Sequence, residues 1–214
     1  MKVNLKILDS ALVYAERQID DLNEKTLVPN PLQRRRLTRS SKILIYLADK
    51  IGFKNGRIVL GNENGECPAT SEIINAIVDQ TNVSPTAFQN SVHNTPASYL
   101  SIQDGNQNEI ITVSDYRRLS NSVLKTAAIK AKLGQDEILI AFVDALNFKE
   151  IDEINKCGLK FLECGVALKI AYTDEIADIK TDKQCLDGFL DGHKDMIALH
   201  FAFQNGGTVF EVEI

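Results

Sequence analysis

The sequence has no long hydrophobic run, and no apolar stretch approaches the ~18 residues that a membrane-spanning helix needs. Its first residues, Met1–Lys6, lack the continuous apolar segment of a signal peptide, so we expect a cytoplasmic protein. Positively charged residues are also outnumbered: the sequence has 24 Lys and Arg against 29 Asp and Glu, for a net charge of −5. This balance argues against a general nucleic-acid binder.

Cysteine is scarce as well. Four cysteines are present, and their spacing fits no C-x-x-C or zinc pattern: Cys67, Cys157, Cys164 and Cys185. In a reducing compartment we expect free thiols, some of them buried as small apolar residues. Adding His193 and His200 creates no convincing ligand set, so we expect neither a metal ion nor another cofactor.

The apolar segments that are present predict one α/β domain over residues 1–214. Short apolar runs suited to buried strands alternate with stretches suited to helices, and this alternation is typical of a wound sheet. We expect strands at 57–61, 109–113, 137–143 and 167–172. The longest expected helix covers 118–133 and ends at Gly134.

Two patterns compete at the N-terminus. Residues 2–8 alternate between polar and apolar side chains, as a half-buried strand does. One long helix is favoured instead by apolar residues spaced three and four apart: Leu5, Leu8, Leu12, Ala15, Ile19 and Leu22. Periodicity alone favours the helix.

The C-terminus predicts a β-hairpin that completes the sheet. Residues 197–203 and 208–214 are both apolar and β-prone, and Asn205-Gly206 between them suits a type I′ turn. In this register His200 faces Glu211 as a cross-strand polar pair.

Residues 84–102 are dense in small and polar side chains. Such a composition suits either a close approach of two backbones or a pocket that presents polar groups. A plain surface helix would carry more Lys and Glu, and a plain core helix more Leu and Ile.

Three motifs together resemble the β-ketoacyl synthase-like family over roughly residues 2–175. They are Arg34-Arg35-Arg36-Leu37-Thr38-Arg39-Ser40-Ser41-Lys42, then Gly65-Glu66 with Ala69-Thr70, then Ser84-Pro85 through Phe88 to Ser91-Val92-His93-Asn94 and Leu100-Ser101-Ile102. The resemblance implies one half of a thiolase-like fold, beginning with a strand at 2–8 and a short helix at 16–22. It also implies a dimer, in which strand 109–114 pairs with its symmetry mate.

A ketosynthase needs a cysteine at a sharp strand-to-helix turn, where the helix N-terminus favours the thiolate. The corresponding position here is Tyr116-Arg117, with no cysteine nearby, and no His-Gly-Thr motif follows. We therefore expect a pseudoenzyme without condensing activity of its own. A hydrolase built on Ser114 or Ser120, with His93 as base and Asp115 orienting it, is a weaker alternative.

The resemblance further implies that Asn90, Ser91, Val92, His93 and Asn94 lie at a dimer interface and shape an acyl tunnel. Alternatively, His93 and Asn94 are hydrogen-bonded core groups that tie a loop to a helix.

The basic cluster Arg34, Arg35, Arg36 and Arg39 has two interpretations. It binds an acidic acyl carrier protein or its phosphopantetheine phosphate, or it pairs with nearby carboxylates such as Glu66.

Taken together, we predict a non-catalytic, chain-length-factor-like subunit of aryl polyene type polyketide or fatty-acid synthesis. It would pair with itself or with a ketosynthase. The alternative is a stand-alone protein that binds acyl groups or acyl carrier protein.

Overall fold

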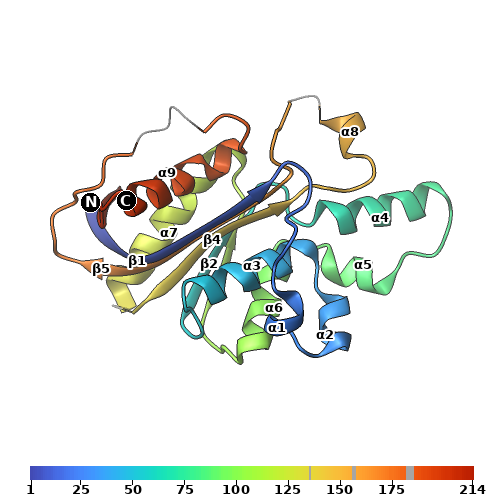
Figure 1. The fold of residues 1–214 in the computed structure, drawn as a ribbon, viewed down its shortest axis with the longest axis horizontal. Coiled ribbons are helices and arrows are strands. Elements are labelled where there is room, and N and C mark those ends of the chain that lie inside the picture. The colour runs from blue at the N-terminus through green and yellow to red at the C-terminus, as the bar shows by residue number, and fades with distance from the viewer. Residues whose placement is uncertain (135, 156–157, 182–185) are drawn as a thin grey trace.

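The computed structural model describes residues 1–134, 136–155, 158–181 and 186–214, which contain one six-stranded mixed sheet (Figure 1). The strand order is β3-β2-β4-β5-β1-β6. Strands β2, β3 and β4 are parallel to one another, while β5 runs antiparallel to β4 and β1, and β6 antiparallel to β1. The strands are β1 (Lys2–Ala15), β2 (Arg57–Gly61), β3 (Ile110–Val113), β4 (Ile138–Ala145), β5 (Glu163–Thr173) and β6 (Val209–Glu213).

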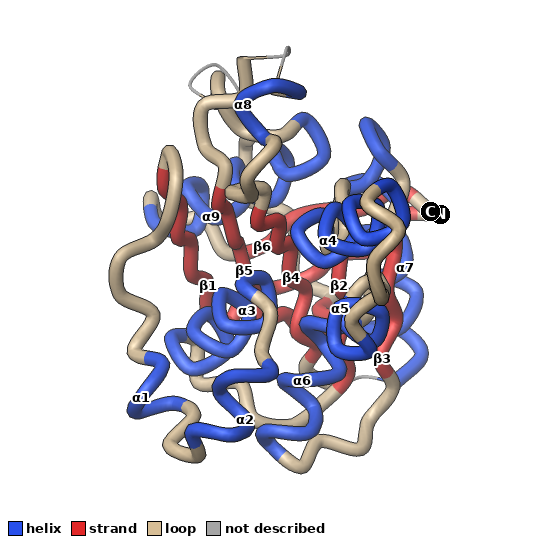
Figure 2. The backbone as a smooth tube through the Cα atoms, turned by 90° about the vertical axis from the view of Figure 1, so that its right-hand side faces the viewer, coloured by secondary structure: helices blue, strands red, loops and turns tan. Residues whose placement is uncertain are grey.

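Helices cover both faces of this sheet (Figure 2). Side chains of α3 and α6 enter the core on one face, and those of α7 and α9 enter the core on the other. The predicted α/β class is therefore confirmed. The helices are α1 (Glu24–Leu27), α2 (Pro31–Arg36), α3 (Arg39–Lys50), α4 (Cys67–Val78), α5 (Pro85–Asn90), α6 (Thr95–Asp104), α7 (Leu119–Gly134), α8 (Ile151–Ile154) and α9 (Lys194–Gln204).

The N-terminal segment is a strand, as the family resemblance implied, and it is longer than predicted. β1 runs to Ala15 because it has a partner on each side: β5 along most of its length and β6 beside residues 2–6. The helix suggested by periodicity alone is wrong, and so is the short helix expected at 16–22, because those residues are coil and bends. Hydrogen bonds from two neighbouring strands override the helical spacing.

The predicted C-terminal hairpin is also wrong. Residues 197–203 belong to α9, and β6 pairs with β1 instead. His200 Nδ1 consequently lies 2.9 Å from Ser10 Oγ, and Glu211 pairs with Lys2 at 2.7 Å. Met196 to Leu199 are four successive buried residues. The start of α9 therefore lacks the repeat of apolar positions every three to four residues by which a half-exposed helix is recognised in a sequence.

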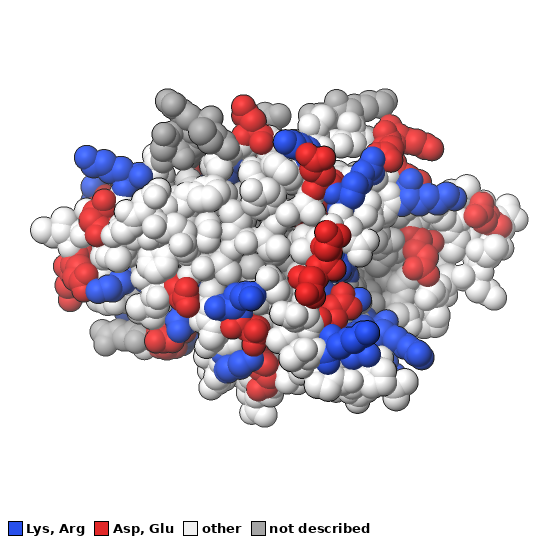
Figure 3. Space-filling view, in the orientation of Figure 1, with Lys and Arg blue, Asp and Glu red and all other residues white. Residues whose placement is uncertain are grey.

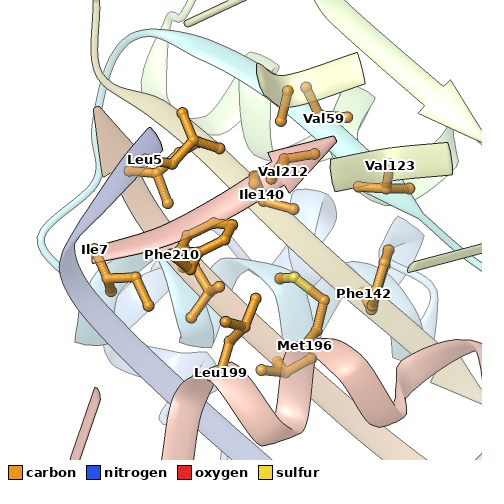
Figure 4. Close-up of a cluster of buried hydrophobic side chains, with 14 of the residues drawn as sticks. Leu5, Ile7, Val59, Val123, Ile140, Phe142, Met196, Leu199, Phe210 and Val212 are labelled. Carbon is orange, nitrogen blue, oxygen red and sulfur yellow. The ribbon is translucent and has the colours of Figure 1, made fainter. Parts of the chain in front are cut away.

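Apolar side chains from the sheet, α7 and α9 form the core on one face (Figure 4). Phe142 of β4 is fully buried, and its ring lies over Gly61 of β2. A Cβ atom added at Gly61 would stand 1.9 Å from that ring, so the strand needs glycine there.

Within the described ranges, no helix has both the length and the apolar character required to cross a membrane.

Candidate functional site

The loops that follow β2, β3 and β4 come together at one edge of the sheet. These three strands are parallel, so their carboxyl ends point the same way. Open α/β sheets bind ligands at this edge. The loops supply Glu63 and Asn64 after β2, Tyr116 after β3 and Leu146 after β4.

The predicted nucleophile position lies in a sharp turn between β3 and α7. A single 3₁₀ turn, Tyr116–Arg118, joins the strand to the helix, and Tyr116 has a φ of +31°. A positive φ is unusual for a bulky residue and marks a strained turn. Tyr116 is 61% exposed, and the Arg117 side chain lies outside the described part of the chain.

A cavity of about 480 Å³ opens beside this turn. Its volume is in the range typical of ligand pockets. Most of its wall is apolar, and polar groups gather at one part of it. The lining residues include Leu146, Phe148, Ile151, Leu159, Phe189 and Leu190, together with Glu63, Asn64, Cys67, Tyr116, Asp191 and Lys194.

A buried ion pair holds the polar part of the cavity in place. Asp144, at the end of β4, accepts hydrogen bonds from the backbone N–H groups of Glu63 (3.0 Å) and Asn64 (2.8 Å). It also lies 2.7 Å from Nε2 of His193, which is fully buried. Burial alone lowers the pKa of His193, but the hydrogen bonds and charges of Asp144 and Cys164 outweigh it and raise the pKa to about 10. The raised pKa favours the imidazolium form, paired with Asp144.

Glu63 carries the half-buried carboxylate of the cavity. One carboxylate oxygen accepts the Gly192 N–H at 3.0 Å, and burial raises the pKa of the group. Nearby, the Lys194 ammonium lies 2.7 Å from Asp191.

Cys67, the first residue of α4, is the only described thiol in the cavity wall. Its Sγ donates to the Asn64 carbonyl at 3.2 Å. Burial, together with the charges of Asp144 and Glu66, raises the pKa of this thiol. Cys67 is accordingly a poor nucleophile at neutral pH, because the thiolate is the reactive form. Cys164 is buried and free, while Cys157 and Cys185 lie outside the described residues.

The alternative hydrolase site is not assembled in the described structure. His93 Nδ1 contacts Asn62 Oδ1 at 2.5 Å, whereas the Asp115 carboxylate accepts from Ser122. Ser120 is buried and donates to the Gly192 carbonyl. His93 thus has an amide as its partner and not the carboxylate of a catalytic triad.

Residues 90–94, from the last residue of α5 to the residue before α6, do not line the cavity, although His93 lies against Gly65 in the loop after β2. Asn90 is buried, donates to the Arg36 carbonyl at 3.2 Å and accepts from the Tyr99 hydroxyl at 3.1 Å. Ser91 Oγ donates to the Phe88 carbonyl, while Val92, His93 and Asn94 are exposed. A separate hollow of about 200 Å³ includes Asn90, Val92 and Asn94 in its wall.

Of the four arginines in the basic cluster, two bind other groups of the chain and two are exposed (Lys and Arg are blue in Figure 3). Arg39 binds the buried Glu163 through Nε at 2.8 Å and also pairs with Glu24 at 3.4 Å. Arg34 donates to the Val28 carbonyl at 2.7 Å. Arg35 and Arg36 are exposed.

Glu66, the carboxylate that the sequence suggested as an arginine partner, is bound by a hydroxyl instead. Thr38 Oγ1 donates to it at 2.8 Å. Glu66 is 2% exposed, and burial raises its pKa to about 7.

Sequence reasoning did not find Glu63 and Asp144, two of the residues that organise the cavity, and it considered the third, His193, only as a metal ligand. A charged residue at the end of an apolar strand such as β4 could have marked Asp144 as a candidate. Within the described residues, no group of three or more His, Cys, Asp or Glu is arranged to hold a metal ion.

Comparisons with known proteins support a single family. The model of the β-ketoacyl synthase N-terminal domain matches residues 14–187. No curated protein matches the chain. Among solved structures, a ketosynthase (ApeO) in complex with its chain length factor (ApeC) from Xenorhabdus doucetiae is 17% identical, with a TM-score of 0.67 and 85% of each chain covered.

Two further solved structures agree. The ishigamide ketosynthase/chain length factor is 10% identical with a TM-score of 0.63, and the match covers 83% of this chain. A type II polyketide synthase acyl-carrier protein in complex with its ketosynthase, bound to the hexaketide, is 12% identical with a TM-score of 0.65, over 80% of this chain. The chain spans 64% of each of these two matched chains. At these identities the likeness shows the fold, and the predicted thiolase-like half is confirmed.

Proposed function

We propose a function from one premise: the chain belongs to the β-ketoacyl synthase N-terminal domain family. It acts as a non-catalytic, chain-length-factor-like subunit that pairs with a ketosynthase and helps to shape the site of acyl-chain growth. The pathway is polyketide or fatty-acid-like synthesis of the aryl polyene type, and residues 1–214 act as one unit.

The side chains around the β3–α7 turn support a role without condensation. The turn carries Tyr116 in place of a thiol. The thiol of Cys67 stays protonated at neutral pH because its pKa is raised, and His193 is locked against Asp144. A ketosynthase needs a thiolate and histidines that can donate and accept protons, and the described residues of this cavity supply neither.

The observation that carries the subunit role is the apolar surface of α4 and α5. Helix α4 has no buried residue, although it contains several large apolar side chains. Ile74, Ile77 and Val78 are 55%, 64% and 72% exposed, and Phe88 of α5 is 69% exposed. Large apolar side chains exposed on two neighbouring helices suit a protein interface.

Strand β3 supplies a second candidate surface, because it ends the sheet and pairs only with β2 among the described strands. Asn62 connects the two parts: its N–H donates to the Val113 carbonyl at 3.3 Å, and its side chain donates to the His93 carbonyl at 2.8 Å. We propose that β3 pairs with a partner strand while α4, α5 and residues 90–94 cover the partner's surface.

Co-expression with a ketosynthase that has its active-site cysteine tests this proposal. We expect a heterodimer by size-exclusion chromatography with light scattering, and Ile77→Lys should disrupt it because a charge then enters the apolar contact. Ile176→Lys is the matched control, since Ile176 is 88% exposed near α9. A stable homodimer that ignores the ketosynthase would overturn the pairing.

A second candidate function, binding of acyl carrier protein, is favoured by Arg35 and Arg36. Both are exposed at the end of α2, and no described ion pair involves either of them. Two exposed guanidinium groups suit an acidic protein or a phosphate. Unchanged carrier-protein affinity in the Arg35→Ala, Arg36→Ala double variant, measured by fluorescence anisotropy, would eliminate this candidate.

A further inference from the structure

The wall of the cavity beside Tyr116 has an apolar part and a polar part. Leu146, Phe148, Ile151 and Leu159, from the chain between β4 and β5, form much of its apolar wall. Glu63 stands at the polar part of the wall. A cavity with an apolar body and a few fixed polar groups selects a ligand by the chemistry of its polar end.

Glu63 has no cationic partner among the described ion pairs. Among the described residues its carboxylate accepts a hydrogen bond from the Gly192 backbone, and burial makes its charge costly, as the raised pKa indicates. The neighbouring cations are already engaged: His193 binds Asp144 at 2.7 Å, and Lys194 binds Asp191 at 2.7 Å. A partly desolvated carboxylate in this position gains most from an added cation.

The backbone that carries Glu63 is held rigidly. The Asp144 carboxylate accepts the N–H groups of both Glu63 and Asn64, and Gly192 fixes the Glu63 carboxylate itself. Asp144 is in turn fixed by His193 in the core. A group that is already oriented loses little conformational entropy when a ligand binds to it.

We propose that this cavity binds a small aliphatic or aromatic amine, with its apolar body against Leu146, Phe148 and Ile151 and its ammonium group against Glu63. A carboxylate of the same shape is repelled by Glu63. The proposal goes beyond the subunit role, because it depends on the chain's own cavity and not on any partner.

The test compares three six-carbon probes in the isolated chain: hexylamine, hexan-1-ol and hexanoate. Isothermal titration calorimetry gives the affinities, and amide NMR shifts of residues 63, 64 and 116 locate the site. We expect hexylamine to bind about tenfold more tightly than hexan-1-ol, as one charge-assisted contact provides. Hexanoate should bind most weakly.

Glu63→Gln identifies the group responsible, because glutamine can still accept the Gly192 N–H while losing the charge. We expect the preference for hexylamine over hexan-1-ol to disappear, with hexan-1-ol affinity unchanged. Glu72→Gln, on the exposed side of α4, is the matched control and should preserve the preference.

Hexanoate binding as tightly as hexylamine would overturn the proposal, and so would shifts located elsewhere or no binding by any probe. The wild-type comparison of the three probes decides the question even if a variant fails to fold.

Discussion

The two edges of the sheet differ in what covers them. At the β6 edge the chain covers its own outer strand: the backbone N–H groups of Asp178 and Ile179 donate to the Val209 carbonyl at 3.0 and 2.9 Å, and α9 buries four successive residues. At the β3 edge the outer strand pairs with β2 alone among the described strands, and α4, the helix that follows β2, buries none of its residues. We call these the closed side and the open side.

The difference lies in burial and not in composition. Phe210 on the closed side is 5% exposed, whereas Phe88 on the open side is 69% exposed. Both sides carry large apolar residues, so water exposure separates side chains that stabilise the monomer from those available to a partner. Four predictions test this separation, from the largest expected effect on stability to the smallest.

Phe142→Ala should disrupt the buried core between the two sides. Removing a fully buried ring leaves a cavity between β2, β4 and α9, and we expect the free energy of unfolding to fall by about 4 kcal/mol. Urea denaturation monitored by circular dichroism measures this change. A loss below about 1 kcal/mol would show that the core rearranges to fill the space.

Glu163→Ala should remove about 3 kcal/mol, because it leaves Arg39 without its buried partner and the Ile19 N–H without its acceptor. The same denaturation experiment applies. Asp152→Ala breaks the exposed pair with Arg17 and serves as the control, in which we expect no measurable change.

Glu66 should make stability depend on pH. Its pKa is about 7 in the folded chain and lower in the unfolded chain, so the folded state binds more protons between about pH 4.5 and 7. The free energy of unfolding should therefore fall as pH rises through this window, by roughly 2–3 kcal/mol.

The titration of Glu63 and His193 also lowers the free energy of unfolding as pH rises, because the pKa of each is raised in the folded chain. Glu66→Gln separates the contribution of Glu66 from theirs. Denaturation at several pH values should show a flatter profile for Glu66→Gln than for Glu72→Gln. Equal slopes in the two variants would exclude Glu66 as the cause.

Phe88→Ala should produce the smallest change in stability, about 0.5 kcal/mol or less, since the side chain is already in water. It should nevertheless weaken association with the partner, which analytical ultracentrifugation measures. If this substitution destabilises the monomer as much as Phe142→Ala does, the distinction between buried core and open surface fails.

Much of the fold could be predicted from the sequence, because its central strands are short apolar runs between clear breaks. The strand predicted at 57–61 coincides with β2, and α7 begins one residue after the predicted start. α9 was mistaken for a strand because a helix buried on several faces has no polar stripe. Hydrophobic periodicity reveals a helix only when one side of it is exposed to solvent. The first turns of α9 are buried on nearly all sides, so they show no such periodicity.

The cavity was harder to predict for a different reason. Asp144 and His193 are 49 residues apart in sequence and meet only after β4 and α9 have packed. The sequence motifs drew attention to residues 84–102, which lie on the open side, whereas Glu63 belongs to no conspicuous pattern. The absence of a cysteine at the β3–α7 turn, by contrast, could be predicted from the sequence alone.

The close fit of Phe142 over Gly61 constrains how the two positions can change during evolution. Neither position can change freely, since any side chain at Gly61 meets the ring and a smaller residue at Phe142 leaves a void. The two sites therefore form an epistatic pair, in which the order of substitution matters. A lineage that enlarges Gly61 must first shorten Phe142, so we expect the two positions to covary among relatives.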